Sequence, residues 1–298
     1  MSRDGGWFVT ASRHHVQVWR VMETVAKANE LITAKDDVWC LALSRDGTRV
    51  VIGCADGCIL VWNHLTNITE RWMHGHDFCS VGCVAFSYDG RHVVSGSSDG
   101  SVRIWDCHTG NEVSMYQTSH CVTRCVAFSR DSGRVAIGFE TYGSDSEGTV
   151  RIWNPSNGQI QIRPETGWMD SVAFSHDDSY VMFGSSRGVL IWNLTTNEST
   201  HLVGSGRLPD GTRVHSLGIG CFHIYDPVDQ EATNDTYPYL LSISDNRDWI
   251  LGGQAEHDCW ISPHYRNFTW AYVAKSRVWL VYRSKSMIVL DLKSTQRV

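Results

Sequence analysis

The sequence predicts an all-β protein built from repeated small antiparallel sheets. The clearest repeat unit lies between Gly75 and Asp106, where three alternating apolar segments are joined by the turns Asp89-Gly90 and Asp99-Gly100. Asp-Gly turns between alternating apolar residues indicate antiparallel hairpins. A tryptophan closes the third segment of each copy, at separations of 43, 43, 48 and 39 residues: Trp19, Trp62, Trp105, Trp153 and Trp192. A period of about 40 to 45 residues indicates one four-stranded unit for each copy.

The first copy is incomplete. It has an expected second strand, Trp7–Ala11, and a third, Val16–Trp19, but no innermost strand, and Met1–Gly5 matches the end of a phrase that recurs as Leu43–Gly47. A sheet without its innermost strand leaves backbone groups unpaired. We therefore expect the natural domain to extend upstream of Met1, or the true start of the gene to lie earlier.

The next four copies are regular, and the later part is degenerate. In the second copy the innermost, second and third strands are expected at Trp39–Ser44, Arg49–Gly53 and Cys58–Trp62, and in the third copy at Cys83–Ser87, His92–Gly96 and Ser101–Asp106. In the fourth copy they are expected at Arg124–Ser129, Arg134–Gly138 and Thr149–Trp153. The fifth copy runs from an innermost strand at Asp170–Ser175 to a third strand at Val189–Trp192. A Ser-, Gly- and acid-rich insertion, Phe139–Glu147, interrupts the fourth copy. Beyond about residue 194, Arg213–Gly218 and Cys221–Asp226 are expected to be second and third strands, and the strand before them is missing from the pattern.

The opening Gly75-His76 and the closing Trp105-Asp106 resemble the WD40 repeat, one blade of a β-propeller. The resemblance implies one propeller over residues 1–298, with about seven four-stranded blades, the first lacking its innermost strand. It also implies a hydrogen-bonded tetrad that orients the strands: His76, Ser95, Asp99 and Trp105. In other copies Ile52, Ile137 and Phe183 stand at the Ser position, so apolar packing is expected to replace the tetrad there.

Composition excludes several classes of function. The net charge is -6 and the pI about 6.1, which argues against a phosphate-backbone partner such as nucleic acid. The sequence has no apolar run long enough to span a membrane and no secretory signal, so a cytoplasmic location is expected. In that compartment the ten cysteines are expected to stay reduced.

Two motifs suggest chemistry that their context does not support. Gly96–Gly100 and Gly184–Gly188 match the Gly-x-Ser-x-Gly pattern of hydrolases, but here a strand enters a hairpin turn instead of a helix. Four zinc-type ligands follow one another at His74, His76, Cys79 and Cys83. Cys83 recurs as Cys40 and Cys125, which indicates a small core residue. We expect no catalytic residue, no metal and no cofactor, and a metal site is the minor alternative.

A rim of variable residues is the predicted binding surface. Trp39, Gly82, Arg124 and Asp170 immediately precede the innermost strands, and they differ while the strands after them repeat. Blade packing does not require these residue types, and aromatic and Arg side chains dominate binding hot spots. The expected partner-binding residues are Trp39, Arg124, Tyr142, Trp168, Asp170 and Arg187. The alternative is a solvated set of loops with no dedicated partner.

The C-terminal tail, residues 239–298, carries a second resemblance. Asp248-Trp-Ile250, Trp260-Ile-Ser-Pro263 and Met287–Asp291 are similar to the end of fungal NACHT-WD40 (STAND-type) proteins, which are large signalling ATPases. This implies a non-catalytic sensor region whose ligand relieves inhibition of an upstream NACHT domain. The sequence has no Gly-Lys dipeptide and hence no phosphate-binding loop of its own. The alternative is a stand-alone scaffold of a ubiquitin-ligase or RNA-processing complex, and in both cases the partner is a protein of unknown identity.

Overall fold

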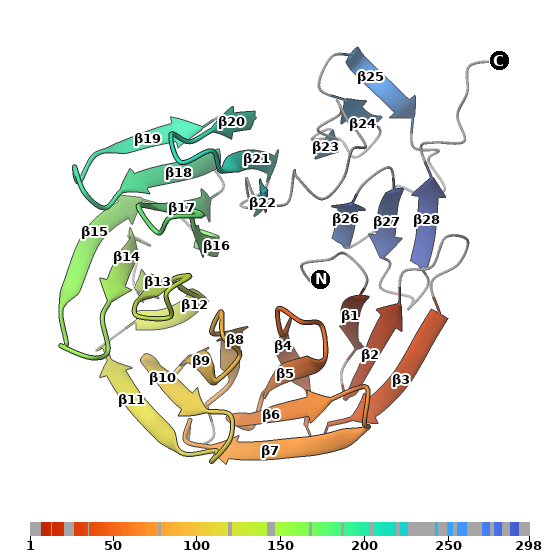
Figure 1. Cartoon of the computed structure of the whole chain (residues 1–298), viewed down its shortest axis with the longest axis vertical. Coiled ribbons are helices and arrows are strands. Elements are labelled where there is room, and N and C mark those ends of the chain that lie inside the picture. The colour runs from red at the N-terminus through yellow and green to blue at the C-terminus, as the bar shows by residue number, and fades with distance from the viewer. Residues whose placement is uncertain are drawn as a thin grey trace. The chain divides into compact units, whose positions relative to one another are not determined.

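The chain forms two compact units. One comprises residues 1–203 with 219–221, and the other comprises residues 204–218 with 222–298. The computed structural model describes residues 7–12, 14–20, 27–34, 36–76, 79–118, 121–141, 147–166, 169–185, 188–202, 205–218, 221–225, 242–243, 249–252, 255–260, 270–274, 277–281 and 287–291. Within these residues every regular element is a β-strand, as predicted (Figure 1). No helix in this part of the chain is long and apolar enough to cross a membrane.

The first unit holds five antiparallel sheets. The first has three described strands, β1 (Trp7–Ser12), β2 (His15–Arg20) and β3 (Lys27–Thr33). The other four sheets have four strands each: β4 (Val38–Leu43), β5 (Arg49–Cys54), β6 (Cys58–Asn63) and β7 (Ile68–His74); β8 (Val81–Phe86), β9 (His92–Ser97), β10 (Ser101–Asp106) and β11 (Glu112–Gln117); β12 (Cys121–Phe128), β13 (Val135–Thr141), β14 (Glu147–Trp153) and β15 (Ile160–Thr166); β16 (Met169–Phe174), β17 (Tyr180–Ser185), β18 (Gly188–Asn193) and β19 (Ser199–Leu202). Four-stranded antiparallel sheets in this order are typical of propeller blades.

The second unit holds three three-stranded sheets within its described residues. They are β20 (Ser205–Arg207), β21 (Arg213–Gly218) and β22 (Cys221–Tyr225); β23 (Ser242–Ile243), β24 (Trp249–Gly252) and β25 (Ala255–Trp260); β26 (Trp270–Ala274), β27 (Arg277–Val281) and β28 (Met287–Asp291). The strand thought to be missing before Arg213 is present as β20, three residues long, and that prediction was wrong. Too short for any alternation, β20 carries no pattern that sequence reasoning could detect. One propeller of about seven blades stays a prediction.

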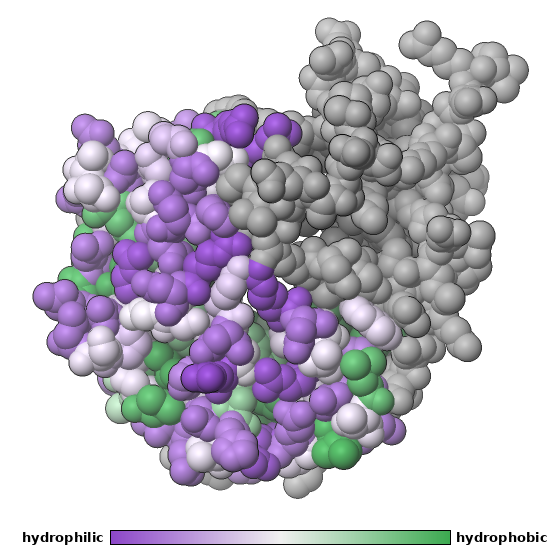
Figure 2. Space-filling model, viewed as in Figure 1, coloured by the Kyte–Doolittle hydropathy of each residue, from purple (hydrophilic) through white to green (hydrophobic). Residues whose placement is uncertain are grey.

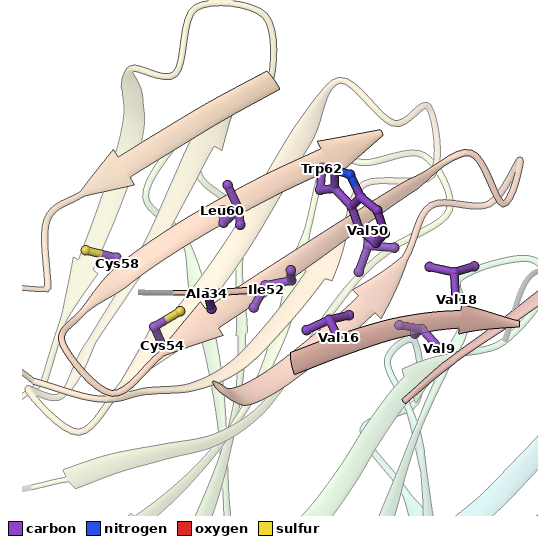
Figure 3. Packing of buried hydrophobic residues seen from close by; sticks show 10 residues of the cluster. All are labelled: Val9, Val16, Val18, Ala34, Val50, Ile52, Cys54, Cys58, Leu60 and Trp62. Carbon is purple, nitrogen blue, oxygen red and sulfur yellow. The ribbon is translucent and has the colours of Figure 1, made fainter. Parts of the chain in front are cut away.

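Consecutive sheets of the first unit pack face to face. The innermost strands β4, β8, β12 and β16 lie next to one another, while β7, β11 and β15 form the outer edges (Figure 1). The core between the first two sheets is aliphatic: Val16 of β2 faces Val50 and Ile52 of β5, and Trp62 closes the cluster (Figure 3). All four side chains are fully buried. Each sheet therefore stabilises its neighbour by burying apolar surface between them.

The recurring cysteines are explained by close packing within the sheets. A Cβ atom added at Gly53 would lie 2.5 Å from Sγ of Cys40, and one added at Gly138 would lie 2.5 Å from Sγ of Cys125. The innermost strand thus carries a small cysteine where the second strand carries a glycine. Burial raises the pKa of the Cys83 thiol well above its usual value, with smaller contributions from Cys40 and Cys125. These three cysteines are packing residues, and the Cys83 thiol stays protonated.

The structure corrects the predicted insertion of the fourth copy. β13 continues to Thr141 and β14 begins at Glu147, with Phe139 paired to Thr149 and Glu140 paired to Gly148. Four of the nine residues predicted as an insertion, Phe139, Glu140, Thr141 and Glu147, therefore belong to a longer hairpin. Residues 142–146 lie outside the described residues.

The predicted rim residues lie inside the innermost strands, each of which begins one to three residues before them, whereas the sequence placed them at or just before the strand starts. In each four-stranded sheet the pairing between the first two strands shifts register at the same position, which is occupied by Trp39, Gly82, Arg124 or Asp170. Such a β-bulge leaves one residue without a cross-strand partner and redirects its side chain. We call this end of the four sheets the bulge end.

Candidate functional site

The four residues of the expected tetrad lie together in the sheet β8–β11. Nδ1 of His76 is 3.0 Å from Oδ2 of Asp99, and Nε2 of His76 is 2.7 Å from Oγ of Ser95. Nε1 of Trp105 donates to the same Ser95 oxygen at 2.9 Å. A carboxylate only accepts, so Nδ1 of His76 carries a proton, and Ser95 donates to Nε2 in the neutral imidazole. The network joins the segment before β8 to β9 and β10.

Asp99 is the ionised end of this network. Burial acts to raise its pKa, but the hydrogen bonds from His76 and Ser101 outweigh burial and lower the pKa of Asp99 to about 2. The backbone N–H of Ser101 also donates to Oδ1 of Asp99 at 2.7 Å. The carboxylate therefore keeps its negative charge at every physiological pH.

Two sheets without the tetrad use another acceptor, which the sequence reasoning missed. Nε1 of Trp62 donates to Oδ1 of Asn67 at 3.3 Å, and Nε1 of Trp192 donates to Oδ1 of Asn197 at 3.0 Å. Both asparagines adopt a left-handed backbone, with φ of 56° and 61°. Asparagine tolerates this conformation better than other non-glycine residues. The expectation that apolar packing alone replaces the tetrad was incomplete, and the Trp-to-Asn spacing of five residues in both copies could have revealed the contact.

Trp39 is the most exposed large apolar side chain at the bulge end. Its side chain is 64% exposed, whereas Trp62 of the same sheet and Trp105 of the next sheet are buried. Arg124 is also exposed and pairs with the carboxylate of Glu140 on the adjacent strand. The sheet between those of Trp39 and Arg124 has Gly82 at its bulge, which offers no side chain. The structure therefore places two of the six predicted binding side chains at the same end of two sheets that are separated by one sheet.

Only one of the other four predicted binding residues lies within the described part of the chain. Asp170 lies at the bulge of β16, and Tyr142, Trp168 and Arg187 lie outside the described residues. Their part in a binding surface stays a prediction.

The motif-based alternatives gain no support from the described residues. The residues Gly96–Gly100 form the end of β9 and a tight turn into β10, without a helix. No group of three or more His, Cys, Asp or Glu side chains is placed to hold a metal within the described part of the chain. His76 belongs to the tetrad, and Nδ1 of His74 lies 3.0 Å from Sγ of Cys58.

The opposite ends of the same sheets carry a row that sequence reasoning missed. The guanidinium carbon of Arg45 lies 3.5 Å from the ring centre of Tyr88, and that of Arg130 lies 4.9 Å from it. Arg130 also donates to the Tyr88 hydroxyl at 2.8 Å and contacts His176. Each of the four residues lies two positions after the end of an innermost strand, in four consecutive sheets: Arg45, Tyr88, Arg130 and His176. We call this end of the sheets the turn end. The row links the sheets to one another through cation–π contacts.

A polar cleft of about 840 Å³ lies between the second and third sheets of the first unit. Arg49 crosses it and donates to the carbonyl oxygen of Gly90 at 2.7 Å, and Arg71 donates to the carbonyl oxygen of His108 at 2.9 Å. Both guanidinium groups are thus used to join neighbouring sheets. The lining as a whole has three arginines, including these two, and three acidic residues, so the cleft has no single preferred ligand class.

Comparison with known proteins agrees with the geometry. Residues 28–63 and 68–106 match the family model of the WD domain, G-beta repeat. The chain is 32% identical over 216 residues to apoptotic protease-activating factor 1 of Rattus norvegicus, covering 66% of this chain and 16% of the relative. It is 26% identical over 195 residues to the protein of the same name from Homo sapiens, covering 62% of this chain and 12% of the relative. The chain therefore contains WD40 repeats and spans a small part of the length of these relatives. Domains of this repeat are generally non-catalytic scaffolds that bind proteins.

Proposed function

We propose that this chain is a non-catalytic recognition domain whose protein partner binds at the bulge end. The exposed Trp39 carries the proposal. A bulge on a rigid innermost strand holds its indole in solvent, and no packing role within the described residues accounts for it. Tryptophan and arginine on rigid elements are the residue types that contribute most to protein–protein binding.

A finer proposal concerns the protein to which this domain contributes. We propose that it is the sensor end of a NACHT-type signalling ATPase in the cytoplasm, and that partner binding relieves inhibition of an upstream ATPase domain. The tail from residue 239 and the similarity to two apoptotic protease-activating factors support this proposal. The chain itself is expected to hydrolyse no ATP, because it has no Gly-Lys dipeptide to form a phosphate-binding loop.

The test compares what the chain retains from its own cell extract with what two variants retain. Trp39→Ser removes the exposed indole, and Val113→Ser removes another well-exposed apolar side chain, 56% exposed, from the outer strand β11. We expect one or more proteins to be retained by the wild type and by Val113→Ser, and to be lost with Trp39→Ser. Equal retention by all three proteins would contradict the proposed surface. Retention that survives stringent salt would instead favour a stable scaffold over a conditional sensor.

A further inference from the structure

The bulge end is acidic around its exposed tryptophan. Asp36 and Asp37 directly precede β4, and the carbonyl oxygen of Asp37 accepts a hydrogen bond from the N–H of Ala55 at 2.9 Å. This contact places Asp36 and Asp37 beside the turn that carries Asp56. Val38 pairs with Cys54, so the three carboxylates and Trp39 share one end of the same sheet.

The neighbouring sheets add further negative charge at this end. Asp99 lies in the turn between β9 and β10, at the end of the sheet where Val81 pairs with Ser97. Its hydrogen bonds with His76 and Ser101 keep it ionised. Glu140, near the end of β13, is neutralised by Arg124. The described bulge end therefore carries a net negative charge.

The carboxylates near Trp39 have no cationic lysine or arginine partner among the described residues. Asp37 meets only His14, whose Nε2 lies 3.6 Å away, and neither Asp36 nor Asp56 forms an ion pair in that part of the chain. Lys35 lies outside the described residues. Asp37 is exposed and Asp36 and Asp56 are half-buried, at the same end of the sheet as the exposed indole. Carboxylates and an indole ring face both favour positive charge, so this end of the sheet attracts cationic groups.

We infer that the segment bound at the bulge end is cationic, and that it presents a Lys or Arg side chain to the indole of Trp39 and the carboxylates of Asp36, Asp37 and Asp56. The inference rests on the proposed function, and it names the chemistry of the partner. An acidic or phosphorylated segment would meet uncompensated negative charge here.

The test measures binding of a fluorescein-labelled oligolysine peptide to the full chain by fluorescence anisotropy. We expect Trp39→Ala to weaken binding by about threefold to thirtyfold and Trp39→Phe to restore part of it, because phenylalanine keeps a smaller ring face. Asp36→Asn and Asp37→Asn are each expected to weaken binding by about twofold to fivefold. Binding should fall when NaCl is raised to about 0.3 M, and an oligoglutamate peptide should not bind.

Glu198→Gln is the matched control, because it removes one exposed carboxylate between β18 and β19, away from the bulge end. Its affinity for oligolysine should equal that of the wild type. Equal binding by the wild type and Trp39→Ala, or an equal loss with Glu198→Gln, would overturn the inference. If Trp39→Ser loses a cellular partner while oligolysine binding is insensitive to Trp39, recognition at the bulge end stands and the cationic class is wrong. If neither experiment responds to Trp39, the proposed function fails as well.

Discussion

Ser95 accepts the indole N–H of Trp105 at 2.9 Å, and this contact ties the second strand of a sheet to the third. Both residues are buried, so neither polar group has water as an alternative partner. Replacing Ser95 by Ala leaves the Trp105 N–H and the Nε2 atom of His76 without their common partner. We expect Ser95→Ala to lower the free energy of unfolding by about 1–3 kcal/mol, measured by urea denaturation. A loss well below that range would show that the network contributes little.

In the sheet β4–β7, which has no tetrad, the side-chain oxygen of Asn67 accepts the indole N–H of Trp62. Asn67→Gly keeps the left-handed backbone but removes the oxygen that Trp62 uses, and we expect a loss of about 1 kcal/mol. Asn67→Ala also places a Cβ in the left-handed region and should cost about 1–2 kcal/mol more. Thermal unfolding of the two variants separates the hydrogen bond from the backbone effect. Equal melting temperatures for Asn67→Gly and the wild type would mean that the hydrogen bond is unimportant.

Asp99 makes stability depend on pH in acid. Its pKa is lowered from 3.8 to about 2 in the folded chain, so its contribution is complete above about pH 4 and is lost as the pH falls toward 2. The contribution is about 2 kcal/mol, with the side chain 21% exposed. Urea unfolding at a series of pH values between these limits should show a smaller acid-dependent loss in Asp99→Asn than in the wild type. Parallel pH curves for the two proteins would contradict this assignment.

Gly96 of β9 packs closely against Cys83 of its own sheet and against Thr123 of the next sheet. A Cβ there would contact the side chain of Thr123 and lie 2.8 Å from Sγ of Cys83. We expect Gly96→Ala to destabilise the chain by about 1–3 kcal/mol through overpacking. Gly133→Ala is the control, because its added Cβ would approach only the exposed Asp131 side chain, at 3.3 Å or more. Equal urea midpoints for the two variants would rule out tight packing at Gly96.

The inner three strands of each regular sheet could be read from the sequence, whereas the outermost strands could not. The second strand from His92 and the third strand Ser101–Asp106 begin where the Asp-Gly turns predicted them. The outer strand Glu112–Gln117 is mostly exposed, and its Val113 and Met115 are exposed while Ser114 and Tyr116 are half-buried, so its apolar residues do not mark the covered face. Its position depends on pairing with β10, which is a tertiary contact.

The sequence singled out two residues of the bulge end but could not predict their geometry. Trp39 and Arg124 stood out because they break a repeat, yet a bulge is a mismatch between two strands and is invisible in one of them. The ion pair between Arg124 and Glu140 depends on the register of β12 against β13 in the same way. The cation–π row at Tyr88 joins separate copies, so no single repeat carries a sign of it.

The most direct test of the bulge end as a recognition surface is site-specific photocrosslinking in the cells that express the chain. A benzophenone amino acid replaces either Trp39 at the bulge end or Val113 on the outer strand β11, both of which are well exposed. The account predicts that irradiation attaches a protein to position 39 and that the same protein is absent from position 113. No adduct at position 39, or the same adducts at both positions, would contradict it.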